Sequence, residues 1–200
     1  MEIDKLLMEH MKSMEFPIVS SETELSEGYS MIQNYLRNSK EESLTDLAVD
    51  YAKVFLGAGA TENSAAYPYE SVYTSSKRIM MQEARDEVLD VYKSKRLVKD
   101  NNIKALPEDH VSLELEFMAF LCEEALSALD LKDSSLVLSS LTEQRDFLDR
   151  HMLNWIHGFC YDIAKYADTE FYKGVGKVTN AFLHLDRSNL DYVMSYYGLS

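Results

Sequence analysis

The sequence is poor in glycine and proline, the residues that most often interrupt secondary structure. Seven glycines and three prolines among 200 residues amount to about 5% of the chain, where average usage is roughly 12%. A sandwich or barrel of short strands needs turn residues every ~8–12 positions, which this chain cannot supply. Because 46% of the residues are apolar, a disordered acidic segment is also excluded. The composition therefore predicts one helix-rich domain with a sizeable core.

Basic residues are scarce as well. The chain has 20 lysines and arginines against 34 aspartates and glutamates, a formal net charge of −14. Such a surface repels phosphate backbones, so we expect no nucleic-acid partner. Residues 1–50 and residues 101–150 each hold eleven acidic and only four basic residues. These blocks are typical of solvated helix faces, and they would also suit docking to a basic partner.

A long apolar run is missing. The longest stretch free of Asp, Glu, Lys and Arg is His151–Tyr161, with 11 residues, whereas a membrane span needs about 18. Glu2, Asp4 and Glu9 stand where a signal peptide would have a basic start and then an apolar segment. We therefore expect a cytoplasmic protein with no stable membrane insertion.

Motifs for catalysis and for cofactor binding are missing too. Cys122 and Cys160 have the spacing of neither a redox pair nor a metal site, and their apolar neighbours predict two buried thiols. None of the five histidines follows a glutamate by three positions, as di-iron bundles require. Gly174–Lys177 lacks the first glycine and the final Ser or Thr of a phosphate-binding loop. We expect no enzymatic activity, no metal and no bound cofactor.

Helical periodicity is what the sequence has in abundance. Apolar side chains recur at intervals of three and four residues along most of the chain, and Pro107 suits the first position of a helix. Residues 57–76 form the one long irregular stretch, with Gly57 as a helix stop. We predict an all-α fold, a single-domain helical bundle of about seven or eight helices over residues 1–200. The expected helices cover residues 3–14, 22–37, 44–56, 76–97, 107–129, 134–167 and 169–185, and a short eighth over 186–197 is left open.

The segment Pro107–His110 is the first candidate binding site. An Asp and a His near a helix N-terminus could together accept hydrogen bonds from a ligand and donate to it. The alternative is structural: Asp109 would interact with the helix dipole, and His110 would pair with Glu114, one turn further along. Spacing alone favours the structural alternative.

The segment Tyr67–Tyr73 is the second candidate. Three tyrosines surround Pro68 in the irregular stretch, and such an amphipathic surface suits peptide binding. These tyrosines could instead pack over the core. The total of 13 tyrosines shifts the balance slightly toward binding.

An ordered set of segments resembles the TorD/DmsD family of cytoplasmic chaperones, the redox-enzyme maturation proteins. The family motif Glu-x-x-x-Glu-Pro-x-Asp-His-x-x-x-Glu-Leu is matched by Pro107–Leu115, although Asn102 and Leu106 stand in place of its two leading glutamates. This departure removes any role for an acid just before the proline, and it suggests a divergent branch or a different client. The other matching segments are Asp50–Gly57, Pro68–Tyr73, Phe147–Trp155 and Phe171-Tyr172.

The resemblance implies an all-helical fold without catalysis. Members of this family bind the twin-arginine signal peptide of a molybdopterin-dependent oxidoreductase precursor, and they hold the apo-enzyme until its cofactor is inserted, which delays export. By match to the motif, Asp109 would accept hydrogen bonds from an arginine or a backbone amide, and aromatic side chains would supply an apolar wall. The residues that this assigns to signal-peptide binding are Tyr51, Phe55, Pro68, Tyr69, Tyr73, Pro107, Asp109, His110 and Glu114.

Two other interpretations remain open. The first is a permanent structural or assembly subunit of a redox-enzyme complex, which the apolar and tyrosine-rich segments would serve equally well. The second is a helical enzyme of unknown chemistry, which no motif supports. His151 and Trp155 in the matching helix are expected to be core residues. The expected partners are the signal peptide and the apo-oxidoreductase precursor, and the chain could be a monomer or a homodimer.

Overall fold

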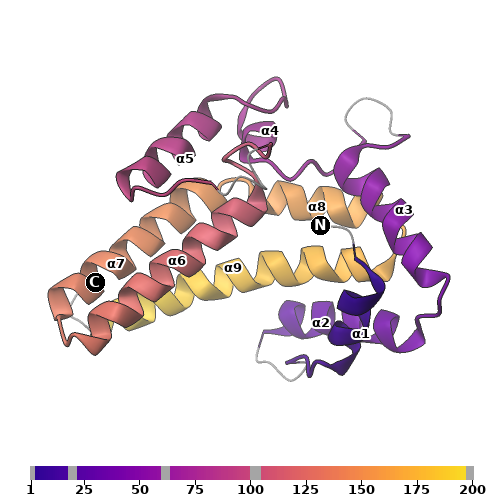
Figure 1. Ribbon diagram of the computed structural model, residues 1–200, viewed down its shortest axis with the longest axis horizontal. Helices are drawn as coiled ribbons and strands as arrows, with labels where there is room; N and C mark the ends of the chain where they lie inside the picture. The colour runs from indigo at the N-terminus through magenta and orange to yellow at the C-terminus, as the bar shows by residue number, and fades with distance from the viewer. Residues whose placement is uncertain (1–2, 18–21, 60–63, 100–104, 197–200) are drawn as a thin grey trace. The chain divides into compact units, whose positions relative to one another are not determined.

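The computed structural model describes residues 3–17, 22–59, 64–99 and 105–196 (Figure 1). These residues contain nine α-helices, one π-helical turn and no strand, which confirms the predicted all-α fold. The only β-type pairing among them is an isolated bridge between Tyr69 and His110. The elements are α1 (Lys5–Ser13), α2 (Thr23–Asn38), α3 (Ser43–Leu56), α4 (Glu70–Thr74), α5 (Glu83–Ser94), α6 (Val111–Asp130), α7 (Ser134–Phe147), η2 (Leu148–Met152), α8 (Ile156–Tyr166) and α9 (Glu170–Tyr196).

The chain divides into two compact units. Unit 1 comprises residues 1–67 and 157–182, and unit 2 comprises residues 68–156 and 183–200. Helix α9 contributes residues to both. The prediction of a single domain over residues 1–200 stays a prediction. No helix among the described residues is long and apolar enough to cross a membrane.

Unit 1 is held together by a buried aspartate on α3. Asp50 is 2% exposed, and its Oδ1 accepts a hydrogen bond from the Asp168 N–H at 2.9 Å. Its Oδ2 accepts from the Thr169 N–H at 2.8 Å and from the Thr169 hydroxyl at 2.6 Å. Asp50 therefore caps the N-terminus of α9 from 118 residues away, where a negative charge is favoured by the unpaired N–H groups and the helix dipole.

Aromatic rings and two glycines complete the packing of unit 1. The Phe55 ring lies 5.3 Å from both the Tyr51 and Tyr172 rings, measured between centroids. Gly28 on α2 and Gly174 on α9 allow close contact: a Cβ added at Gly174 would lie 2.9 Å from the Gly28 carbonyl oxygen. Any larger residue at either glycine would force these two helices apart.

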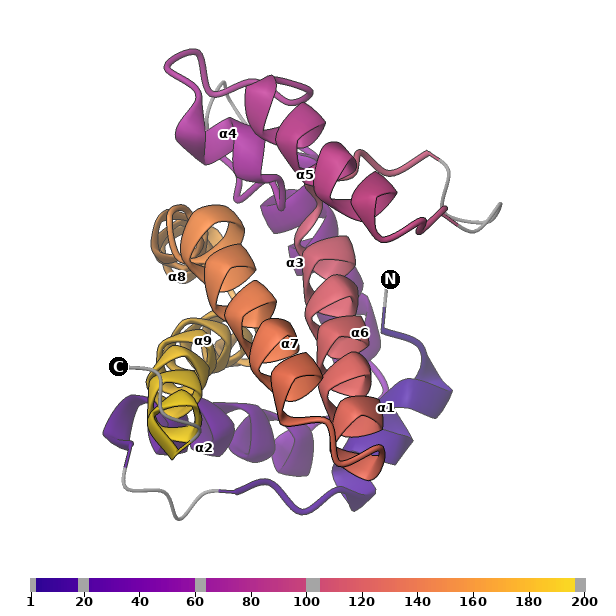
Figure 2. The ribbon, with the colours of Figure 1, turned by 90° about the vertical axis from the view of Figure 1, so that its left-hand side faces the viewer.

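Unit 2 is centred on the antiparallel pair α6 and α7, which lie side by side (Figure 2). The Phe117 ring of α6 packs edge-on against the Phe147 ring of α7, with 4.6 Å between centroids. The Tyr92 ring of α5 lies 5.0 Å from Phe117. These three rings are buried and form the aromatic centre of the unit.

Several predicted helix boundaries are wrong. Residues 57–76 contain α4, and α5 begins at Glu83 rather than near residue 76. Arg78 and Met81, between these helices, have φ angles of 52° and 59°, which a right-handed helix excludes. At the C-terminal end, α9 continues unbroken to Tyr196, so residues 186–197 do not form a separate short helix.

The predicted helix over residues 134–167 starts correctly and then breaks. Asp133 accepts hydrogen bonds from the Ser135 and Leu136 N–H groups at 3.0 Å, which fixes the start of α7. The break comes at η2, where the Leu153 N–H bonds the Leu148 carbonyl five residues back. The indole N–H of Trp155 donates a hydrogen bond to the His151 carbonyl at 2.7 Å. In an α-helix, this carbonyl would accept from the Trp155 backbone N–H instead.

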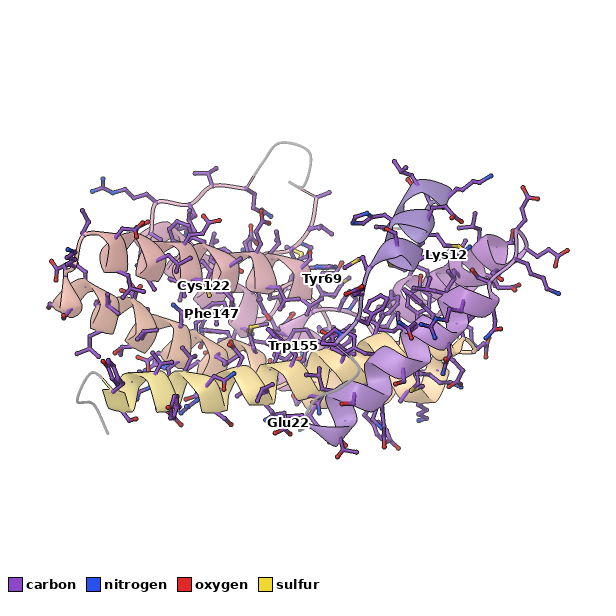
Figure 3. All side chains as sticks on the ribbon, turned by 90° about the horizontal axis from the view of Figure 1, so that it is seen from below. Lys12, Glu22, Tyr69, Cys122, Phe147 and Trp155 are labelled. Carbon is purple, nitrogen blue, oxygen red and sulfur yellow. The ribbon has the colours of Figure 1, made fainter. Side chains whose placement is uncertain are left out.

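Two further expectations fail in unit 2. Helix α6 starts at Val111 with His110 as its N-cap, so Pro107 precedes the helix instead of opening it. Cys122 is exposed, whereas Cys160 in unit 1 is buried as expected. Figure 3 shows Cys122 on α6. Cys122 therefore lies outside the buried face of α6, which includes Leu113, Phe117 and Leu121.

Candidate functional site

Unit 2 joins the two segments that sequence reasoning singled out separately. Tyr69 and His110 form an antiparallel bridge, in which the Glu70 N–H donates to the Asp109 carbonyl and the Val111 N–H donates to the Pro68 carbonyl, both at 3.0 Å. The Tyr69 and His110 rings meet edge to face, with 5.1 Å between centroids. The tyrosine segment and the Asp-His segment therefore form one structure.

Asp109 connects the two segments through its side chain. It is 0% exposed, and its Oδ2 accepts hydrogen bonds from the Ser71 N–H at 2.9 Å and the Ser71 hydroxyl at 2.5 Å. Ser71 lies in the first turn of α4, so Asp109 caps this helix from 38 residues away. Its other oxygen, Oδ1, is buried, and no described residue supplies it with a hydrogen bond.

His110 caps the next helix along the chain. Its Nδ1 accepts a hydrogen bond from the Ser112 N–H at 3.1 Å, at the start of α6. Burial lowers the pKa of His110 to about 4, so at neutral pH the ring is uncharged and its Nε2 carries the proton. The expected pair between His110 and Glu114 is wrong, because Glu114 is directed into the core.

Glu70 and Glu114 are two buried carboxyls covered by the segment around η2. Glu70 is 1% exposed; its Oε1 accepts from the Asn154 amide at 2.7 Å, and its Oε2 lies 3.2 Å from His151 Nδ1. Glu114 is 0% exposed, and its Oε2 accepts from the Trp155 indole N–H at 3.2 Å. We call Glu70, Asp109 and Glu114 the carboxylate cluster.

Burial and, after it, mutual repulsion affect the charge of this cluster. Burial, together with the negative charges of Glu70 and Asp109, raises the pKa of Glu114 well above its usual value. This favours the protonated, neutral form of Glu114, which removes one of three negative charges from a buried region. Glu114 Oε1 is also without a hydrogen-bond partner in the described part of the chain. The cluster therefore has two oxygens, one on Asp109 and one on Glu114, that nothing in the described structure saturates.

Glu108, one residue before Asp109, has two basic partners for its carboxylate. It is 6% exposed and bonds both Lys99, at 2.8 Å, and Arg85. Burial acts to raise the pKa of Glu108, but these two cations lower it below its usual value. Glu108 is thus a satisfied ion-pair residue, whereas its neighbour Asp109 has no cation beside it among the residues described.

The predicted site residues fall into two groups. Tyr73 joins the unit 2 group by stacking on Trp155, with 5.6 Å between ring centroids, and Figure 3 shows Tyr69 and Trp155. Tyr51 and Phe55 belong to unit 1. Those that unit 2 brings together are Pro68, Tyr69, Tyr73, Pro107, Asp109, His110 and Glu114.

Sequence reasoning missed the partners of these residues. Ser71 and Glu70 lie inside the tyrosine segment without a motif of their own, and Asn154 had no assigned role. His151 and Trp155 are core residues as expected, 5% and 2% exposed, but they also bond the carboxylate cluster. Of the two positions that replace the family's glutamates, Leu106 is half-buried, and Asn102 lies outside the described residues.

The described residues of the site form an aromatic surface and no candidate metal site. Within the described part of the chain, no group of three or more His, Cys, Asp or Glu side chains is arranged to hold a metal ion. What the arrangement offers is a half-buried aromatic surface of Tyr69, Tyr73 and His110, supported from beneath by buried carboxyls. Such a surface can bind a peptide through ring contacts and hydrogen bonds.

Comparison with known proteins covers most of the chain. Residues 21–161 match the family model described as nitrate reductase delta subunit. A chaperone protein TorD of Vibrio cholerae serotype O1, strain ATCC 39315, is 28% identical over 158 residues, which are 79% of this chain and 68% of that protein. The TorD chaperone of Photobacterium profundum is 26% identical over 84% of this chain and 75% of its own length. That of Shewanella loihica is 25% identical over 92% and 84%. The chain thus spans about two thirds of the length of its Vibrio cholerae relative.

Proposed function

The chain belongs to the family described as the nitrate reductase delta subunit, and we propose that it is a chaperone for a molybdopterin-dependent oxidoreductase. The observation that carries this proposal is the family match over residues 21–161, which agrees with curated relatives named as TorD chaperones. The resemblance to the TorD/DmsD family drawn from the motifs is confirmed by the same matches. A chaperone of this kind has no catalytic reaction of its own.

The proposed client segment is the twin-arginine signal peptide of the oxidoreductase precursor. Its basic start suits a chain with a net charge of −14, and its apolar middle suits the aromatic surface of Tyr69, Tyr73 and His110. In this proposal the protein works in the cytoplasm, holds the apo-enzyme while the cofactor is inserted, and delays export until then.

Asp109 has two alternative roles in this proposal. Motif matching makes it a direct acceptor for an arginine, while its complete burial and its bonds to Ser71 favour a positioning role, in which it fixes Tyr69 and His110. An Asp109→Asn variant separates the two, because its amide oxygen can still accept from the Ser71 N–H but carries no charge. If Asp109 contacts the peptide directly, both Asp109→Asn and Asp109→Ala should bind the signal peptide weakly. If Asp109 only positions its neighbours, only Asp109→Ala should bind it weakly.

Calorimetry with the signal peptide of a co-encoded oxidoreductase tests the proposal. We expect a complex at micromolar protein for the wild type and at least tenfold weaker binding for Asp109→Ala, with the fold retained by circular dichroism. An absence of binding both to the signal peptide and to the apo-enzyme would overturn the chaperone function. Normal binding by Asp109→Ala and by His110→Ala would overturn only the site assignment.

Tyr51 and Phe55 are proposed as part of the apolar wall on motif grounds. Their rings already pack with Tyr172 inside unit 1, so their substitution would affect packing as well as binding. Tyr51→Phe keeps the ring and removes only the hydroxyl. A weaker complex with unchanged stability would support a direct contact between the Tyr51 hydroxyl and the peptide, and unchanged binding would confine any contact to the ring.

A second candidate function is a permanent assembly subunit. The description of the matching family as a subunit of nitrate reductase favours it. Copurification distinguishes the two functions, because a chaperone is absent from the mature, cofactor-loaded enzyme and a subunit remains with it. Stoichiometric recovery of this chain with active oxidoreductase would replace the chaperone proposal.

A further inference from the structure

An apolar groove of about 730 Å³ lies in unit 2 between α5, with the residues that follow it, and α6. Its volume falls within the range of about 300–1,000 Å³ that is usual for binding pockets. Half-buried and exposed apolar side chains line its opening, over a floor formed by the buried Leu113 and Phe117. The accessible apolar side chains that matter here are Leu89, Leu97, Val98 and Phe120.

Exposed apolar surface at this groove is unusual for a chain with so much acid. Val98 is 90% exposed, although a valine of this kind gains free energy when it is covered. Ala119 on α6 is also exposed at the groove. Together with the half-buried Leu89, Leu97 and Phe120 they line one groove, and accessible apolar surface that is gathered in this way suits binding of a partner.

The charged residues around the groove determine what kind of partner fits. Lys99 is paired with Glu108 at 2.8 Å, and Lys93 with Asp90 at 3.3 Å. Glu116 and Glu123 also line the groove, are exposed, and form no ion pair with any described residue. They stand seven positions apart on α6, about 10 Å along the helix axis at 1.5 Å per residue, so both occupy the same rim. The groove therefore presents, beside apolar surface, negative charge that no basic side chain of the described residues neutralises.

We propose that this groove holds part of the apolar middle of the signal peptide, beyond the part that contacts the aromatic surface, while Glu116 and Glu123 pair with the basic residues of the peptide. The proposal rests on the proposed function and extends it to residues that no family motif includes. The wall of the groove contains Glu108 and Leu113, which stand one residue before Asp109 and three residues after His110 in the sequence. The proposal is that one peptide contacts both the aromatic surface and the groove.

The first experiment fills the groove. Ala119→Trp places a large ring at an exposed position of the groove, so the protein still folds. Its matched control is Leu126→Trp, at a position that is 61% exposed on the same helix and outside the groove. Calorimetry should show at least tenfold weaker binding of the signal peptide to Ala119→Trp and unchanged binding to Leu126→Trp. The loss should disappear when the apolar middle of the peptide is replaced by serines.

The second experiment tests the charges. The pair of substitutions Glu116→Gln and Glu123→Gln should weaken binding of the wild-type peptide by about three- to tenfold, as expected for exposed ion pairs. A peptide whose arginines are replaced by glutamines should be insensitive to these substitutions. Asp130→Asn, at the exposed end of α6 and outside the groove, is the control for net charge.

The outcomes separate this inference from the proposed function. If the wild type does not bind the signal peptide, the proposed function fails. If the wild type binds and Ala119→Trp binds equally well, the peptide lies elsewhere and only the groove assignment is overturned. If Ala119→Trp changes the oligomeric state in light scattering and leaves peptide binding intact, the groove belongs to a second copy of this chain, which also overturns the assignment.

Discussion

Each unit contains a buried aspartate that caps a distant helix, but only one of the two is fully satisfied. In unit 1, both oxygens of Asp50 accept hydrogen bonds from the start of α9. In unit 2, Asp109 caps α4 through Oδ2 alone, and its other oxygen has no partner in the described structure. Asp109 also lies close enough to Glu70 and Glu114 for their charges to interact. The aspartate cap is therefore purely structural in unit 1, whereas in unit 2 one oxygen of Asp109 remains able to accept a hydrogen bond.

The largest expected effect comes from truncating these two aspartates. Asp50→Ala leaves two backbone N–H groups and one hydroxyl without their acceptor, and we expect a loss of about 2–4 kcal/mol in the free energy of unfolding. Asp109→Ala should cost less, about 1–2 kcal/mol, because it also relieves repulsion within the carboxylate cluster. Urea unfolding measures both.

The distinction between Asp50 and Asp109 fails if peptide binding is lost in proportion to the free energy of unfolding. We expect Asp50→Ala to bind the signal peptide normally at a temperature where it is folded, and Asp109→Ala to bind weakly. The Asn variants at both positions serve as controls that keep an acceptor oxygen. Equal loss of binding in both Ala variants would mean that Asp109 is as structural as Asp50.

A second prediction concerns how the carboxylate cluster of unit 2 makes the stability of the protein depend on pH. Because the pKa of Glu114 is raised in the folded state, the folded chain retains a proton that the unfolded chain releases near pH 4.5. The folded state then binds more protons, so this group makes the wild-type protein less stable as pH rises above about 4.5. Glu114→Gln removes this contribution and keeps an acceptor for the Trp155 indole.

The measurement is thermal or urea unfolding between pH 5 and 8. The variant should lose less stability than the wild type across this range, and Glu116→Gln, an exposed control on the same helix, should behave like the wild type. Parallel curves for wild type and Glu114→Gln would show that Glu114 is ionised and that the cluster carries its full charge.

The smallest expected effect is at the cap of α6. His110→Ala removes one side-chain acceptor and should cost about 0.5–1 kcal/mol at pH 7.5. The pKa of His110 is lowered from 6.5 to about 4 in the folded state, so the unfolded chain takes up a proton first and the wild type loses stability as pH falls from 6.5 toward 4. The cost of the substitution should therefore shrink at pH 5.

Paired unfolding curves at pH 7.5 and pH 5 measure this difference, with His157→Ala, an exposed histidine of unit 1, as the control. A cost that is equal at both pH values would mean that His110 titrates in the folded protein as it does in the unfolded chain. Its role would then be confined to the cap.

The sequence predicts a structural feature well when the contacts that produce it lie within one helical turn, and poorly when they join distant residues. The all-α fold, the start of a helix at residue 134 and the stop at Gly57, which has a φ of 68°, follow from residues that act within one turn. The break after α7 could not be predicted, because it depends on the Trp155 indole taking the His151 carbonyl. Helix α4 was missed for a similar reason, since Asp109 caps it from 38 residues away.

The candidate site also combines residues that a local motif identifies with residues that only distant contacts bring in. The motif pointed to Asp109 and His110, and the structure joins them to Tyr69 and Ser71. Glu70 could not be found from its neighbours, because its partner His151 is 81 residues away. Apolar character alone does not identify the buried face of α6, since Leu115 is apolar yet 38% exposed.

The exposed thiol of Cys122 gives the protein a built-in attachment point for a reporter. Cys160 is the only other cysteine in the sequence. Burial raises the pKa of both thiols, that of Cys160 to about 12, and the burial of Cys160 protects it from alkylation. A maleimide dye should therefore label α6 at one position without any substitution, three residues from Ala119. Fluorescence from that dye would follow peptide docking in the unmodified sequence and in real time.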